Sequence, residues 1–470
     1  MNKTVAIAAL TAISLSGCSA PRLDQALPPP PVPASWPVGD AYLAQSEAAL
    51  PLVTYGQVFT DVRLQRLIET ALSENRDLRT AAANVAAARA QVRVTRAAQL
   101  PQVGVEGGVD VSRGGTGNGT ATTYSVQGGL SSFELDLFGR YANATVAERE
   151  RALATEAFAR AVRVGLVADI AAAWATYAAD RDLLAIAEET AANARESVRL
   201  TDLRLKGGIA PRTDLAQAEQ VLASAEIAIA EQTTALAQDR NLLRLLVGAE
   251  VDPALLPDSL AEIAPSYLAL PAGVDSRVLL RRPDVIEAEY RLRAAGAEIS
   301  VARARLFPSL SLTGLLGLAS TALADLFTGG AFRFTAGAGA SYAIFDGGAG
   351  RAQVEITEAQ REAALAEYEK AIQTAFREVA DSLADQGTLA ARQRASTANV
   401  AAAVTTARLT DARYRNGVDS FLDSLVAQRS LFAARQQAVQ IELARLLNHA
   451  TVYRVLGGDT EPALQAREGR

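Results

Sequence analysis

The chain has 470 residues and a formal net charge of −6, which argues against a nucleic-acid partner because phosphate binding requires a basic surface. Its single cysteine, Cys18, and single histidine, His449, exclude a disulfide within the chain and zinc sites of the Cys/His type. Hydrophobic residues make up 49% of the sequence and aromatic residues only 5%, so long helices with small packed side chains are favoured over a bulky globular core.

The sequence offers little for catalysis. His449 is the one candidate for an imidazole base, and it lies in an Ala- and Leu-rich helical stretch where packing or a helix-terminal role is the better interpretation. We therefore expect a protein that is not an enzyme, with no catalytic residues, no metal and no cofactor.

Residues 1–17 are predicted to form a lipoprotein signal peptide. Lys3 supplies a positive start, and the apolar run over 5–15 is too short to cross a membrane as a helix. The sequence Leu-Ser-Gly-Cys is typical of a bacterial lipobox, in which cleavage leaves Cys18 as a lipidated N-terminus. Three acyl chains would anchor the protein stably, and Ser19 in place of Asp indicates delivery to the outer membrane. The alternative is an ordinary signal peptide with an incidental cysteine.

A spacer is predicted for the rest of 18–56. Prolines are concentrated between Pro21 and Pro37, and such a segment is extended and stiff. A role as a peptide ligand is the alternative.

The remainder of the chain is an internal duplication. Residues 199–209 match 408–418 at an offset of 209 residues, which also maps Gly248 onto Gly457. The predicted domains are a first repeat over 57–248, a proline-punctuated connector over 249–282, a second repeat over 283–458 and a C-terminal tail over 459–470.

Both repeats follow one plan, in which a helix, two strands, a very long helix and a second long helix succeed one another. The helices are expected over 77–99, 140–206 and 213–247, and again over 283–306, 349–415 and 422–456. A helix of 67 residues would extend about 100 Å at 1.5 Å per residue, which indicates a coiled-coil or helical-barrel architecture. Pro283 and Asp346 are interpreted as helix-start residues.

Strands are expected at about 101–137 and 308–345, where apolar residues alternate with polar or small ones. Val126 and Leu130 share a face, and the phase of the alternation shifts after Ser132. Period two over about ten residues is typical of membrane β-strands. A glycine-rich segment containing Asn118 and Gly119 separates the first two strands and is interpreted as a hairpin loop, because it lacks the ending of a phosphate-binding loop.

Four strands cannot close a barrel, and open edges are not tolerated in lipid. If these strands span the outer membrane, several chains must share one barrel, and three chains would supply twelve strands. The alternative is a soluble four-stranded sheet packed on helices.

Several motifs, in the expected order, resemble the TolC-type outer membrane factor family and its OprM/NodT-like lipoprotein branch. They are RRPDVIEAE at 281–289, VARARLFPSLSLT at 301–313, FELDLFGR at 133–140, IFDGG at 344–348, RYRNGVDSFLD at 413–423 and AQRSL at 427–431. The resemblance covers about residues 40 to 460. It implies a mainly α subunit with a membrane β part, assembling as a homotrimer with a 12-stranded β-barrel and a periplasmic α-helical barrel.

The resemblance also implies a site where the helix pairs meet, at 206–212 and 415–421. In the family these tips close the tunnel, and a periplasmic adaptor, working with an inner-membrane pump of the RND type, opens it. The corresponding aperture and tip residues are Gly208, Asp214, Tyr414, Arg415, Gly417 and Asp423. Val426 stands where family members often carry a second acidic residue, so a less acidic aperture is expected.

The charged residues at the tips have two possible roles. Three Asp423 carboxylates around a narrow axis would repel one another and favour cations, while Arg413 and Arg415 could bridge neighbouring helices. The alternative is that these are solvated helix-end charges, with Asp423 stabilising a helix N-terminus.

These expectations converge on the exit duct of a tripartite efflux system, lipid-anchored in the outer membrane and in contact with its lipid. Two alternatives remain open at this stage: the outer-membrane duct of a type I protein secretion system, and a helical lipoprotein tether that forms no channel.

Overall fold

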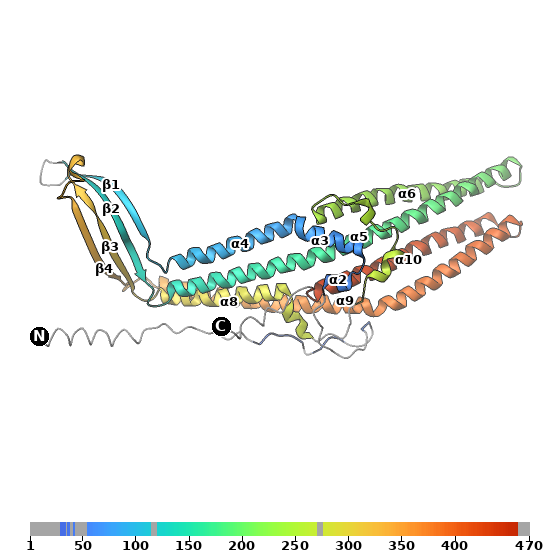
Figure 1. Ribbon diagram of the computed structural model, residues 1–470. Helices are drawn as coiled ribbons and strands as arrows, with labels where there is room; N and C mark the ends of the chain where they lie inside the picture. Colours follow the sequence, from blue (N-terminus) through green and yellow to red (C-terminus); the bar gives the residue numbers. More distant parts are fainter. Residues whose placement is uncertain are drawn as a thin grey trace. The chain divides into compact units, whose positions relative to one another are not determined.

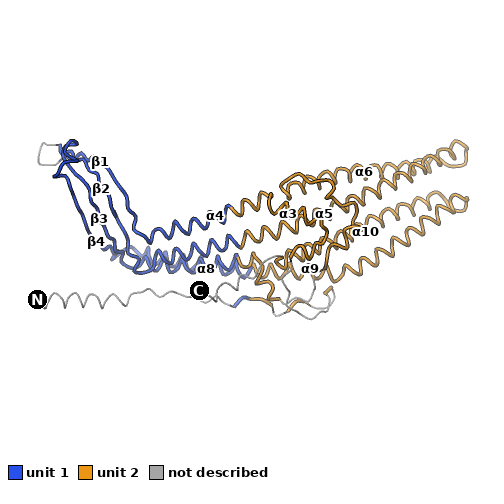
Figure 2. Tube along the Cα trace, in the orientation of Figure 1, with its two compact units in different colours: residues 1–30, 83–156, 287–370 blue, residues 31–82, 157–286, 371–470 orange. Residues whose placement is uncertain are grey.

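The computed structural model describes residues 29–33, 35–37, 41–42, 54–113, 120–269 and 276–458. The predicted signal peptide, Cys18, most of the spacer, the loop containing Asn118 and Gly119, and the C-terminal tail lie outside these residues. Two compact units are coloured in Figure 2. Unit 1 includes 83–156 and 287–370, and unit 2 includes 31–82, 157–286 and 371–470.

Unit 1 contains one antiparallel sheet in the order β1-β2-β3-β4 (Figure 1). Its strands are β1 (Val103–Arg113), β2 (Thr120–Leu135), β3 (Ser309–Ser320) and β4 (Phe332–Ser341), with the short helix η4 (Leu323–Asp325) between the last two. The outer strands β1 and β4 each pair with one neighbour among the described residues. Within the described part of one chain, the sheet therefore has two open edges.

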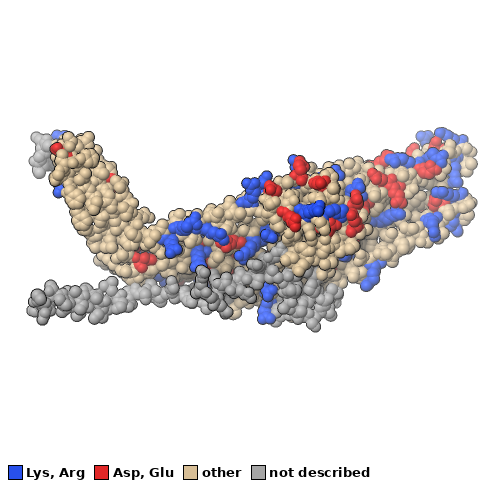
Figure 3. Space-filling view, viewed as in Figure 1, with Lys and Arg blue, Asp and Glu red and all other residues tan. Residues whose placement is uncertain are grey.

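The strand register sorts apolar and polar side chains onto opposite faces of the sheet, because directly opposed residues on antiparallel strands share a face. One row contains Val126, Leu318 and Phe332, and the next contains Gln127 and Arg333. Apolar side chains elsewhere on the sheet are exposed in the single chain, by 81% at Val105 and 65% at Phe334. The face seen in Figure 3 carries few charged side chains.

A β-bulge interrupts β2 where the alternation changes phase. Leu130 pairs with Gly314 and Phe133 with Leu312, so two residues of β2 lie opposite one residue of β3. The extra residue keeps the apolar side chain of Phe133 on the face that Leu130 occupies. The phase shift predicted from the sequence is thereby confirmed.

Helices flank the strands in both repeats. They are α4 (Arg76–Ala97) and α8 (Pro283–Ala304) before the strands, α5 (Arg140–Lys206) and α9 (Ala349–Arg415) after them, and then α6 (Arg212–Val247) and α10 (Phe421–Val455). The two longest helices have the predicted bounds. Pro283 is the first residue of α8, and the Asp346 carboxylate accepts hydrogen bonds from Gly348 N and Gly350 N before α9, so both helix-start predictions are confirmed. None of the helices in the described part of the chain has both the length and the apolar character needed to cross a membrane.

Short elements of unit 2 pack the connector against the long helices. They are α2 (Tyr55–Val58), α3 (Val62–Glu74), η1 (Pro253–Leu255), α7 (Leu260–Ile263), η2 (Ala264–Ser266) and η3 (Ser276–Arg281). The buried Trp174 indole of α5 donates to Leu255 O at 2.9 Å, and the Tyr267 hydroxyl donates to Ala171 O at 2.6 Å. His449 is buried on α10, with Nδ1 3.1 Å from Tyr267 O, which confirms its packing role.

Candidate functional site

Two helical hairpins of unit 2 end in turns of the same geometry. The first tip (206–212) joins α5 to α6, and the second tip (415–421) joins α9 to α10. Gly208 and Gly417 have φ of 72° and 74°, a left-handed conformation that costs other residues roughly 1–2 kcal/mol. The next residue donates its N–H back to the helix, from Ile209 to Arg204 O at 2.8 Å and from Val418 to Arg413 O at 2.9 Å. The predicted turn glycines therefore lie at matching positions of the two tips.

Each turn presents an aliphatic side chain to solvent. Ile209 is 80% exposed and Val418, its equivalent in the second repeat, is 64% exposed. Because the turn backbone is satisfied by the preceding helix, these side chains are held outward on closed turns. An exposed apolar group at the same point of both repeats is suited to contact with another protein.

One ion pair recurs in both hairpins. Lys206 Nζ lies 2.6 Å from the Asp202 carboxylate, and Arg415 Nε lies 2.9 Å from the Asp411 carboxylate. Both pairs join residues four apart on one helix, and such exposed pairs stabilise a helix by only about 0.3–0.5 kcal/mol. Arg415 also contributes to the lowered pKa of Glu196 on α5, after the larger effect of hydrogen bonding from Arg199.

The prediction that Arg413 bridges to a neighbouring helix is wrong within the chain. Its guanidinium forms two hydrogen bonds, of 2.7 and 2.8 Å, to the Asp419 carboxylate in its own turn. This bidentate pairing lowers the pKa of Asp419. In the first tip Ala210 stands where Asp419 would be, and Arg204, the equivalent of Arg413, instead lies over the Tyr414 ring at 4.6 Å from its centroid.

Asp423 caps the start of α10. Ser420 and Asp423 form a reciprocal capping box, in which Asp423 N donates to Ser420 Oγ at 3.3 Å and the Asp423 carboxylate accepts from Ser420 N at 3.2 Å. The helix-stabilising interpretation of Asp423 therefore describes its contacts in the single chain, and the aperture role stays a prediction. Asp214 lies in the first turn of α6, which begins after Pro211 without a side-chain cap.

Aromatic packing joins the two hairpins below the tips. Phe421 and Leu425 of α10 form a buried cluster with Ala218 of α6, and Tyr414 and Val198 pack against it. The Tyr414 and Phe421 rings have centroids 5.3 Å apart. Among the predicted site residues, Tyr414 packs against this cluster, which joins the two hairpins.

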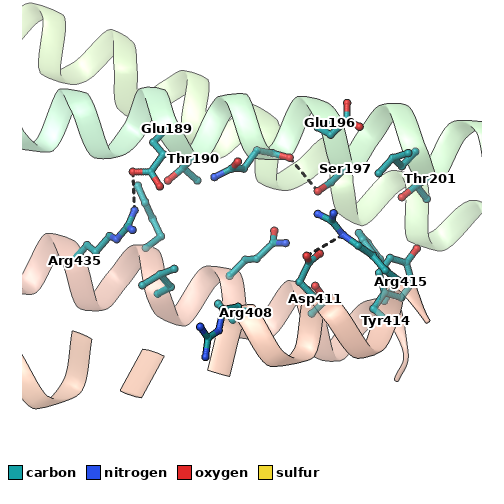
Figure 4. Close-up of a pocket in the computed structure, with 18 of the residues that line it drawn as sticks. Glu189, Thr190, Glu196, Ser197, Thr201, Arg408, Asp411, Tyr414, Arg415 and Arg435 are labelled. Carbon is teal, nitrogen blue, oxygen red and sulfur yellow. Dashed lines mark hydrogen bonds and ion pairs between the residues drawn. The ribbon is translucent and has the colours of Figure 1, made fainter. Parts of the chain in front are cut away.

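A polar groove of about 610 Å³ runs between α5 on one side and α9 and α10 on the other (Figure 4). It is bridged by an ion pair between Glu189 and Arg435, 2.8 Å apart. Tyr414 and Arg415 line the groove, whereas Gly208, Asp214, Gly417 and Asp423 do not.

Five further residues of this region were not predicted from the sequence: Glu189, Arg204, Asp419, Phe421 and Arg435. Comparing the repeats position by position could have found two of them, because Asp419 and Phe421 replace Ala210 and Arg212 of the first tip. Within the described residues no group of three His, Cys, Asp or Glu side chains could hold a metal ion. The arrangement is that of a contact surface made of helix ends, charged pairs and exposed aliphatic groups.

Comparison with known proteins shows which family has this fold. The family model described as outer membrane efflux protein matches residues 67–249 and 274–458. The chain is 39% identical to the probable efflux pump outer membrane protein TtgC of Pseudomonas putida, over 97% of this chain and 96% of that protein. It is 38% identical to the cation efflux system protein CusC of Escherichia coli K12, over 95% and 97%. A crystal structure of CusC superposes with a TM-score of 0.80 at 36% identity, covering 91% of this chain and all of that one.

The duplicated TolC-like fold and these similarities define an outer-membrane channel component of an efflux system. This chain belongs to the outer membrane efflux protein family. The resemblance inferred from the sequence motifs is confirmed, and so are the fold class and the efflux function.

Proposed function

We propose that three copies of the chain form the exit duct of a tripartite efflux system, each anchored in the outer membrane through Cys18. The observation that carries the proposal is the four-stranded sheet with two open edges and an exposed apolar face. Unpaired backbone groups are too costly in hydrocarbon, so β4 of one copy pairs with β1 of the next. Three copies then close twelve strands, a number usual for outer-membrane barrels.

The tips are the contact points for a periplasmic adaptor, through which an RND-type inner-membrane pump drives transport. Ile209 and Val418 supply exposed apolar contacts, and the groove beside Tyr414 supplies polar ones. At rest the second tip narrows the duct, with Asp423 from each copy near the axis. Opening separates the hairpins at the packing of Tyr414 and Phe421.

Site-specific photo-crosslinking in the native cell tests the adaptor contact. The photoreactive residue replaces Ile209 or Val418, since both side chains are exposed and neither position is a turn glycine. Leu245, 73% exposed near the other end of α6, is the control. We expect a periplasmic adaptor to be captured from the tips and not from Leu245. Capture of sister subunits alone at all three positions would overturn the adaptor assignment.

A second pair of crosslinks tests the trimer separately. Cysteines at Val105 on β1 and Phe334 on β4 are expected to link copies into covalent trimers in the outer membrane. A protein that stays monomeric there contradicts the shared barrel.

A further inference from the structure

Arginines mark the strand–helix junctions of unit 1. They are Arg96 at the end of α4, Arg140 at the start of α5, Arg303 and Arg305 at and just beyond the end of α8, and Arg351 near the start of α9. Three of them, Arg140, Arg305 and Arg351, line one cavity with three carboxylates, those of Glu134, Asp136 and Asp346. Both signs of charge are thus gathered where the strands meet the helices.

The carboxylates at this junction already have donors. Glu134 is paired with Arg140 at 2.5 Å, and Asp136 accepts from Ala142 N at 2.7 Å. Asp346 accepts from two backbone N–H groups, of Gly350 and Gly348, which lower its pKa, with a smaller effect from Arg351.

The guanidinium groups of Arg305 and Arg351 differ from these carboxylates in their contacts. Neither Arg305 nor Arg351 forms a side-chain hydrogen bond or ion pair with a residue in the described part of the chain, and both are exposed. They line a cavity of about 440 Å³ together with the three carboxylates and Arg140, so its walls carry three positive and three negative charges. Arg351 also lines an adjoining cavity with Phe307 and Leu306.

Exposed apolar side chains lie in the connection between β4 and α9, beside the cavity. Ile344 and Phe345 are 92% and 90% exposed, and Tyr342 is 59% exposed. Tyr342 and Ile344 line the same cavity as the two arginines. A charged pocket that opens onto an aromatic and aliphatic strip is amphipathic, as is a phospholipid at the edge of a membrane.

We propose that this junction binds a zwitterionic phospholipid of the periplasmic leaflet, with its phosphodiester on Arg305 and Arg351. Guanidinium groups recognise phosphate oxygens through charge-assisted, often bidentate hydrogen bonds. The headgroup ammonium faces Glu134 and Asp136, which matches the balanced charge of the cavity, and an acyl chain follows Ile344 and Phe345. The inference rests on the proposed placement of the sheet in the outer membrane.

Native mass spectrometry of the purified full-length trimer tests this site. Phosphatidylethanolamine is titrated into the detergent-solubilised parent and into the double variant Arg305→Gln/Arg351→Gln. We expect the double variant to bind the lipid about tenfold more weakly, since two charge-assisted contacts are lost. The control Arg392→Gln/Arg394→Gln removes two exposed charges of α9 in unit 2 and is expected to leave binding unchanged.

Phosphatidylglycerol and inorganic phosphate distinguish the possible ligands. Phosphatidylglycerol keeps the phosphodiester but lacks the ammonium, so we expect weaker retention than for phosphatidylethanolamine. Inorganic phosphate is expected not to displace the lipid. Equal binding by the parent and the double variant, stronger binding of phosphatidylglycerol, or displacement by phosphate would each overturn the proposal. The masses of the same ions report trimer formation, so failure of the proposed assembly is recorded independently.

Discussion

The two hairpin tips have almost the same backbone but different side-chain contacts. Both turn at a left-handed glycine, and both keep an ion pair between residues four apart on the first helix. The second tip adds a serine cap, a bidentate arginine pair and the ring of Phe421, where the first has Pro211, Ala210 and Arg212. Duplication has preserved the turn, and divergence has added side-chain contacts mainly to the second copy.

The same divergence appears further along the hairpins. Asp180 of α5 and Asp239 of α6 face each other in the first repeat, where the offset of 209 places Leu389 and Asn448 in the second. Burial raises the pKa of Asp239 to about 7, and the charge and hydrogen bond of Asp180 add to this effect. Asn448, in contrast, is uncharged and donates to Ser382 O at 2.9 Å. The first hairpin therefore contains a pH-sensitive carboxyl pair that the second hairpin lacks.

The largest expected difference between the tips comes from removing the ring of Phe421. Phe421→Ala leaves a cavity beside Ala218 and Leu425 and should destabilise the tip by about 3 kcal/mol. Hydrogen exchange of amides in the second tip measures this loss. Arg212→Ala, the equivalent change in the first tip, is the control and should have little effect. Equal losses of amide protection in the two variants would contradict the difference between the tips.

Alanine at the turn glycines should affect both tips alike. Gly208→Ala and Gly417→Ala meet no neighbouring atom within 4 Å, so backbone strain of roughly 1–2 kcal/mol is the expected cost in each. The same exchange measurement applies. Gly207→Ala serves as the control because its φ is not left-handed. A much larger effect in one tip would show that the turns differ in ways that their backbones do not reveal.

The carboxyl pair predicts a pH-dependent contribution of the first hairpin to stability. A carboxyl whose folded pKa is raised contributes stability below its unfolded pKa, near 3.8, and loses that contribution as the pH rises through about 7. Asp239→Asn should therefore raise the apparent Tm at pH 8 more than at pH 5. Asn448→Asp reverses the comparison and should lower the Tm most at pH 8. A pH-independent effect of Asp239→Asn would argue against a protonated pair.

Substitutions at the two helix caps should change stability less, and in opposite directions in the two tips. Ser420→Ala removes the cap of α10 and should cost about 1 kcal/mol, whereas Pro211→Ser offers α6 a cap that it lacks. Local hydrogen exchange at the first turns of α6 and α10 reports both. Ser420→Thr, which keeps the hydroxyl, should retain most of the protection. If Ser420→Ala loses nothing, the capping box does not stabilise the tip.

The smallest expected effect concerns the stacking of Arg204 on Tyr414. Exposed cation–π contacts contribute about 0.5–1 kcal/mol, so Arg204→Gln should weaken the link between hairpins slightly. A double-mutant cycle with Tyr414→Leu isolates the pair. Additive effects of the two substitutions would mean that the contact contributes nothing.

Local patterns predicted the elements of this fold well. The bounds of α5 and α9 followed from the absence of proline and from flanking glycines, and the bulge of β2 followed from the shift in alternation after Ser132. These features depend on neighbours in the sequence. The alternative that Asp423 stabilises a helix N-terminus likewise depended only on nearby positions, and its contacts with Ser420 agree with it.

Contacts across the hairpins could not be predicted in the same way. The pairing of Arg413 depended on the turn bringing Asp419 back to α9, and the contact of Arg204 with Tyr414 joins residues from different repeats. Helical periodicity says which face a residue occupies but not which helix lies opposite. The aperture role of Asp423 depends on other copies of the chain, and so it remains a prediction.

The open edges of the sheet make assembly part of folding. In the single chain β1 and β4 offer unpaired backbone groups, and side chains such as Val105 and Phe334 face water. Such edges attract any extended chain, so a newly exported subunit is vulnerable to aggregation until its partners arrive. Mass action then makes the apparent stability depend on protein concentration, because in the proposed trimer the edge strands are paired only after assembly. A dilute preparation should melt earlier than a concentrated one, although the sequence is the same.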